Sequence, residues 1–194
     1  MGEEGGANGT NKDFVWVVDP IDGSMNLLRG YPQYSVSIAL LQRDEPIAAC
    51  IADPCRGEVF SAALGQGATV NGQPLAVART AALRQAMAAT VFPKPHAPFM
   101  DAYLARFGAV INEVAGVRRS GSMALELAYL AAGRVDVFWQ RGMGAWDSAA
   151  GVLLIREAGG EVFTLDGLPW LASKEVCAAV PGLAEAWRAL LLAH

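Results

Sequence analysis

The sequence has little basic charge, few cysteines and no long apolar run. Its 194 residues include 15 Lys and Arg against 19 Asp and Glu, which gives a formal net charge of −4, and the basic residues form no block. Binding to a nucleic acid polymer therefore has little electrostatic support. No apolar run reaches the ~18 residues that a membrane span needs. We expect neither nucleic acid nor membrane as a partner.

Cysteine usage and the N-terminal segment indicate the compartment. Cys50, Cys55 and Cys177 cannot all pair and show no C-x-x-C spacing, which is typical of a reduced, cytoplasmic protein. The first residues, MGEEGGANGTNKD, are too polar for a secretory signal peptide. With 53% hydrophobic and 18% charged residues, the chain is of the globular class, and we expect one domain over residues 1–194.

The two parts of the chain differ in their pattern. Apolar and alternating runs predict strands at 14–18, 34–41, 46–52 and 58–63. With the turn signal Asn71-Gly72, they predict mainly antiparallel strands across 14–77. In residues 78–194, helical spacing predicts helices at 98–107, 122–132, 148–158 and 183–192, with strands at 135–139 and 161–164. The whole pattern predicts a layered α/β fold.

Two carboxylates follow the first predicted strand. In VWVVDPIDGS, residues 15–24, apolar β-formers end at Asp19, and Asp22 follows three residues later. Unpaired carboxylates are costly at the end of a buried strand. Mg²⁺ prefers such oxygen ligands, and the N–H groups of Gly23 and Ser24 suit a phosphate. The same spacing is also typical of an Asx turn with capping acids, so both interpretations stay open at this point.

Further acidic residues lie far away in the sequence. Asp147 directly precedes the helix predicted at 148–158, where capping the helix is the ordinary role of an aspartate. Glu3 and Glu4 add carboxylates near the N-terminus, where a surface acidic segment is the ordinary interpretation.

Three separated motifs resemble the signatures of the inositol monophosphatase family of Mg²⁺-dependent phosphomonoesterases. They are Gly2-Glu3-Glu4, Asp19 to Ser24 and Trp146 to Gly151, in the order of the family, and Glu157 to Gly160 follows as in relatives. The resemblance covers essentially the whole chain. It implies an αβαβα fold like that of fructose bisphosphatases, a lithium-sensitive hydrolase and a homodimer.

The resemblance also implies the site residues. Those that would bind Mg²⁺ are Glu3, Asp19, Asp22, Asp147 and the backbone carbonyl of Ile21. The catalytic residues would be Glu3 and Ser24, which orient the attacking water, with Asp19. Substrate would contact Gly23, Ser24, Ser122, Met123, Gln140 and Asp147. Relatives commonly have a Glu at the position of Gln140, and an amide brings no charge.

We therefore expect hydrolysis of a small sugar or polyol phosphate similar to inositol 1-phosphate. The alternatives are a nucleoside bisphosphate, a fructose bisphosphate or histidinol phosphate at the same site. Relatives also carry two long helices before the Gly-Glu-Glu motif, whereas Met1 precedes it here. The resemblance thus implies an N-terminally truncated form of the fold, for which a non-catalytic interaction protein is the alternative function.

Overall fold

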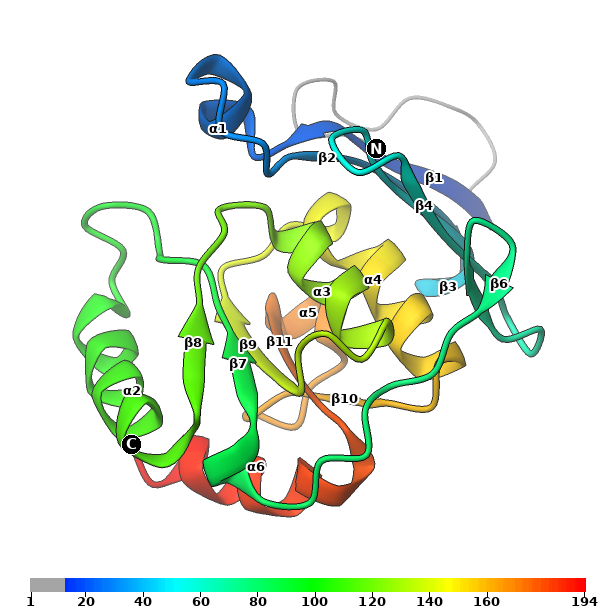
Figure 1. Ribbon diagram of the computed structural model, residues 1–194. Helices are drawn as coiled ribbons and strands as arrows, with labels where there is room; N and C mark the ends of the chain where they lie inside the picture. Colours follow the sequence, from blue (N-terminus) through cyan, green and yellow to red (C-terminus); the bar gives the residue numbers. More distant parts are fainter. Residues whose placement is uncertain (1–12) are drawn as a thin grey trace.

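The computed structural model describes residues 13–194, which form two β-sheets and six α-helices (Figure 1). The first sheet is an antiparallel meander in the order β1-β2-β3-β4-β5-β6. Its strands are β1 (Phe14–Asp22), β2 (Ser35–Gln42), β3 (Glu45–Asp53), β4 (Glu58–Ala63), β5 (Ala68–Val70) and β6 (Gln73–Pro74). The antiparallel strands predicted from the alternating pattern are confirmed, with boundaries that differ by a few residues.

The second sheet is mixed and has the order β10-β11-β9-β7-β8. Its strands are β7 (Met87–Ala89), β8 (Gly116–Arg118), β9 (Val137–Arg141), β10 (Glu161–Phe163) and β11 (Glu175–Ala179). Strand β7 runs parallel to both of its neighbours, β8 and β9, while β11 is antiparallel to β9 and β10. The sequence pattern did not predict β7, β8 or β11.

The helices separate the two sheets and cover the second. They are α1 (Ser24–Leu28), α2 (Met100–Glu113), α3 (Met123–Ala131), α4 (Ala145–Glu157), α5 (Trp170–Ser173) and α6 (Ala184–Leu192). Figure 1 shows α3 and α4 between the sheets, with α2 and α6 beyond the second sheet. The described residues thus alternate as β-α-β-α layers, which confirms the predicted layered α/β class.

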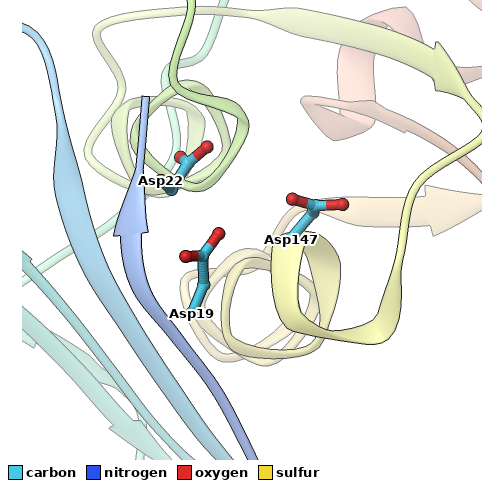
Figure 2. Close-up of side chains that lie close together, drawn as sticks. All are labelled: Asp19, Asp22 and Asp147. Carbon is cyan, nitrogen blue, oxygen red and sulfur yellow. The ribbon is translucent and has the colours of Figure 1, made fainter. Parts of the chain in front are cut away.

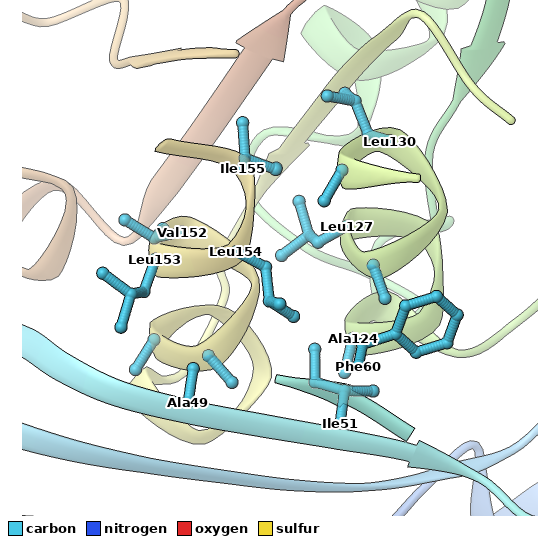
Figure 3. Packing of buried hydrophobic residues seen from close by; sticks show 14 of the residues in the cluster. Ala49, Ile51, Phe60, Ala124, Leu127, Leu130, Val152, Leu153, Leu154 and Ile155 are labelled. Atoms are coloured by element: carbon cyan, nitrogen blue, oxygen red, sulfur yellow. The ribbon is translucent and has the colours of Figure 1, made fainter. Parts of the chain in front are cut away.

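The larger hydrophobic core lies where α3 and α4 pack on the first sheet (Figure 3). Ile51 and Phe60 of that sheet and Leu127 of α3 are completely buried. A smaller cluster fills the space between the second sheet and helices α2 and α6, with Trp187 and Val110 among its buried members. The larger core also includes Phe138 of β9 and Val176 of β11, so α3 and α4 pack against both sheets.

The residues 13–194 include no helix that is both long enough and apolar enough to cross a membrane.

Candidate metal and phosphate site

Three aspartates converge between the first sheet and α4. Figure 2 shows the side chains of Asp19 and Asp22, from β1, turned toward that of Asp147, from α4. One carboxylate oxygen of each lies within 4.8 Å of those of the others. The three residues are 2%, 5% and 7% exposed. Three carboxylates this close and this buried repel one another strongly, and they offer only oxygen ligands, the donor set that hard divalent cations prefer.

A bulge in β1 brings Asp19 and Asp22 to the same side. Residues three apart in a regular strand point to opposite faces, because side chains alternate with a period of two. Here the register with β2 shifts between Asp19, opposite Ser37, and Asp22, opposite Ser35. The extra residue restores a common direction for both carboxylates. The prediction that both aspartates follow the strand is wrong, because β1 continues through the bulge to Asp22.

Asp22 is held by the N-terminal end of α3. Its Oδ2 accepts hydrogen bonds from Ser122 Oγ at 2.5 Å, from the Ala124 N–H at 2.8 Å and from Ser35 Oγ at 3.4 Å. Burial raises the pKa of Asp22, and these hydrogen bonds partly oppose that rise. The partial positive charge of the helix end also favours the carboxylate there. One oxygen of Asp22 is thereby fixed, and the orientation of the other is fixed with it.

Asp147 lies within α4 rather than before it. The helix begins at Ala145 and is capped by Gly144, so Asp147 occupies the first turn, and the prediction that it precedes the helix is wrong. Its Oδ2 accepts a hydrogen bond from the Gly144 N–H at 2.7 Å. This hydrogen bond satisfies the N–H group of the residue that precedes the helix, and it orients the carboxylate of Asp147.

A tight turn continues from the aspartates into α1. Gly23 has a φ of 87°, a backbone conformation that residues with a side chain rarely adopt. A Cβ on Gly23 would also lie 3.0 Å from the carbonyl oxygen of Gln33. Asn26 Nδ2 donates to the carbonyl oxygens of Gln33 at 2.6 Å and Ser120 at 2.8 Å. The turn is thus tied to the loop that precedes α3, next to the aspartates.

These groups line a cavity of about 240 Å³. Among the residues that the sequence singles out, those that line it are Asp19, Ile21, Asp22, Gly23, Ser24, Met123 and Asp147. Gly121, in the segment just before the helix predicted at 122–132, lines it as well, whereas the sequence analysis missed Met25, Asn26 and Arg119. Glu3 lies outside the described residues. The only signals for the missed residues are the position of Met25 and Asn26 directly after the motif that ends at Ser24, and that of Arg119 shortly before the helix predicted at 122–132.

Two predicted substrate residues have other partners in the structure. Ser122 is completely buried and directs its hydroxyl to Asp22. Gln140 is 4% exposed, and its Oε1 accepts from Thr90 Oγ1 at 3.2 Å and from the Val91 N–H at 3.1 Å. Its Nε2 donates to the carbonyl oxygen of Arg141 at 3.1 Å. Neither lines the cavity of the three aspartates, and their contact with substrate stays a prediction.

The chain is similar to known proteins over its whole length. A sequence model of the inositol monophosphatase family matches residues 1–194. Nus factor SuhB of Pseudomonas aeruginosa is 43% identical over 172 residues, which are 86% of this chain and 64% of that protein. The inositol-1-monophosphatase of Rhizobium meliloti is 45% identical over 161 residues, 82% of this chain and 60% of that protein. The chain thus spans less than two thirds of the length of these relatives.

Solved structures share the fold. Inositol monophosphatase from Anabaena sp. PCC 7120 has a TM-score of 0.91 at 36% identity, over 100% of this chain and 77% of that one. SaIMPase-II of Staphylococcus aureus, solved with inositol monophosphate and with 2'AMP, has a TM-score of 0.85 at 27% identity. The inositol monophosphate complex covers 100% of this chain and 75% of that one.

Proposed function

Because the chain belongs to the inositol monophosphatase family, we propose that it is a Mg²⁺-dependent phosphomonoesterase that acts on a small sugar or polyol phosphate. Members of this family generally depend on a metal. The observation that carries the proposal is the buried cluster of Asp19, Asp22 and Asp147 beside a glycine turn. Buried carboxylates that repel one another are stabilised when a cation lies between them.

The residues present fit such a metal. Asp19, Asp22 and Asp147 would hold it, together with the backbone carbonyl of Ile21 and with Glu3, which lies outside the described residues. When bound, Mg²⁺ neutralises phosphate charge, lowers the pKa of a water and stabilises the leaving oxygen. The oxygen-only donor set of the cluster is the one expected for this cation.

The protein groups around the cluster have separate tasks in the proposed reaction. Gly23 and Ser24 receive the phosphate, since the backbone N–H groups at the start of α1 lie beside the aspartates. The Ser24 hydroxyl and Glu3 orient the attacking water. The hydrogen bonds from Ser122 and Ala124 keep Asp22 in place, so the carboxylates need no rearrangement before the reaction.

The substrate is proposed as a class. SaIMPase-II, which shares the fold, was solved with inositol monophosphate and with 2'AMP, so one protein of this fold binds both a polyol phosphate and a nucleotide. A nucleoside bisphosphate, a fructose bisphosphate or histidinol phosphate is the alternative at the same site. Family membership further supports a lithium-sensitive, cytoplasmic homodimer with one catalytic domain over 1–194.

The test is phosphate release from polyol, sugar and nucleotide phosphates, with Mg²⁺ and then with EDTA. We expect release that requires Mg²⁺ and falls by a factor of about 100 or more in Asp22→Asn, because a metal ligand and its charge are lost. Asp44→Asn is the matched control: Asp44 is exposed in the β2–β3 turn with a φ of 70°, which asparagine tolerates. Mg²⁺ affinity measured by calorimetry without substrate gives a second readout, and release that persists in EDTA would contradict the proposal.

A non-catalytic interaction protein is the second candidate. The name Nus factor SuhB, which several relatives carry, is the observation that favours it. A folded chain that binds Mg²⁺ but releases phosphate from none of the esters would support this candidate.

A further inference from the structure

One basic side chain lines the cavity of the three aspartates. Among the described residues that line it, Arg119 is the only basic side chain. Arg119 also lines a second cavity of about 500 Å³, together with Arg118, Ser120 and Glu126. It therefore borders both cavities, a position that a part of the substrate beyond the phosphate would reach.

The guanidinium of Arg119 is not neutralised by a carboxylate within residues 13–194. Two other arginines that line the larger cavity are neutralised, because Arg56 pairs with Asp53 at 3.0 Å and Arg134 pairs with Glu58 at 2.6 Å. Arg119 instead lies over the ring of Phe92, with the guanidinium carbon 4.9 Å from the ring centre. Stacking on a ring limits the motion of a guanidinium but uses none of its N–H donors, which lie in its plane.

The ring that supports Arg119 is itself anchored. Phe92 packs edge-on against Tyr103 and Phe107 of α2, with ring centres 5.9 and 5.8 Å apart. The next residue in the sequence, Ser120, is also fixed, because its carbonyl oxygen accepts the hydrogen bond from Asn26 in the α1 turn. Arg119 is thus tied through its backbone to the turn that we assign to the phosphate, and through its side chain to α2.

We propose that Arg119 is a specificity-determining residue that binds a second anionic group of the substrate, a phosphate or a carboxylate, next to the phosphate that is hydrolysed. This inference rests on the proposed function and narrows its substrate class. A polyol phosphate without a second anionic group has no partner for this guanidinium, whereas a second anion can accept two parallel hydrogen bonds from it. The preferred substrate is then a bisphosphate or a phosphorylated acid.

The test compares two pairs of esters that differ in the second anion. One pair is glycerol 2-phosphate and 2-phosphoglycerate, and the other is fructose 1-phosphate and fructose 1,6-bisphosphate. We expect kcat/KM to favour the member with the second anion, and Arg119→Gln to reduce this preference by about tenfold, the value of one charged hydrogen bond. The pair that responds identifies the second group as carboxylate or phosphate. Arg119→Lys should retain part of the preference, because the point charge remains.

Arg118→Gln is the matched control, because Arg118 is exposed, carries the same charge and lines only the larger cavity. All variants are compared at one ionic strength, since an exposed charge is screened by salt, and their melting temperatures show whether each is folded. An unchanged preference in Arg119→Gln would overturn the inference, as would an equal loss in Arg118→Gln. Phosphate release only from the two esters that lack a second anion would support the proposed function but contradict this inference, whereas no release from any ester would contradict both.

Discussion

At the level of single residues, the hydroxyl of Ser122 both donates and accepts hydrogen bonds. It donates to Asp22 at 2.5 Å and accepts from the Leu125 N–H at 3.4 Å, as the cap of α3. We expect Ser122→Ala to lower the free energy of unfolding by about 1–2 kcal/mol, because a cap and a buried hydrogen bond are lost. We also expect weaker Mg²⁺ binding, because Asp22 is less well held. Denaturant titration and calorimetry measure the two effects.

Ser122→Thr is the control for this prediction, since it keeps the hydroxyl. If metal affinity were unchanged in Ser122→Ala, Ser122 would be only a helix cap.

The contacts of Asp22 also show which part of the site can be predicted from the sequence. Asp19, Asp22 and Asp147 belong to recognisable motifs, and the structure brings them together. Ser122 lies 100 residues from Asp22, and its hydroxyl could not be assigned to that carboxylate from local sequence. Arg119 was missed for the same reason, because its place at the cavity depends on how the loop before α3 meets the α1 turn.

At the level of secondary-structure elements, the close packing of α3 on α4 depends on Gly151. A Cβ at Gly151 would lie 2.4 Å from the Cβ of Leu127, in the core that Figure 3 shows. Alanine is the better helix former by about 1 kcal/mol, but the two helices would have to move apart, and overpacking costs about 1–3 kcal/mol. We expect Gly151→Ala to lower stability and, because α4 carries Asp147, to reduce phosphate release more than the loss of folded protein explains.

Gly108→Ala is the matched control within a helix. Gly108 lies in α2, and a Cβ there meets nothing within 4 Å, so helix propensity alone should act and stability should rise. Chemical denaturation of both variants measures the difference. A stability gain in Gly151→Ala would show that the two helices are not in close contact.

The strands of the second sheet that sequence patterns missed are short, and two of the three are largely buried. Strands β7 (MAA) and β11 (EVCAA) lie inside the second sheet, and every residue of β11 is buried. A strand buried on both faces shows no alternation of polar and apolar residues, so its period cannot be read. Helices α3 and α4 were predicted because each has caps and a longer run of helix-forming residues.

At the level of the whole molecule, an ion pair joins the layers at a distance in sequence and outside the cavity of the three aspartates. Arg134, which follows α3, contacts Glu58 of β4 through two hydrogen bonds of 2.6 Å and lies over the rings of Phe60 and Tyr129. The hydrogen bond from Arg134 lowers the pKa of Glu58 below its ordinary value of 4.5, against the opposing effect of burial. The pair thus links the helical layer to the first sheet.

This ion pair predicts part of the dependence of stability on pH. Because the pKa of Glu58 is lower in the folded state, its contribution is complete above the unfolded value of 4.5 and is lost as the pH falls through the folded value. The pair is partly exposed, so we expect only about 0.5–1 kcal/mol. Glu58→Gln should lower the free energy of unfolding at pH 7 by that amount and by less at pH 3, as measured by urea titration. Glu161→Gln, at an exposed position of β10, is the control and should change the free energy of unfolding at neither pH. If Glu58→Gln lowered this free energy equally at both pH values, packing of the side chain and not its charge would join the layers.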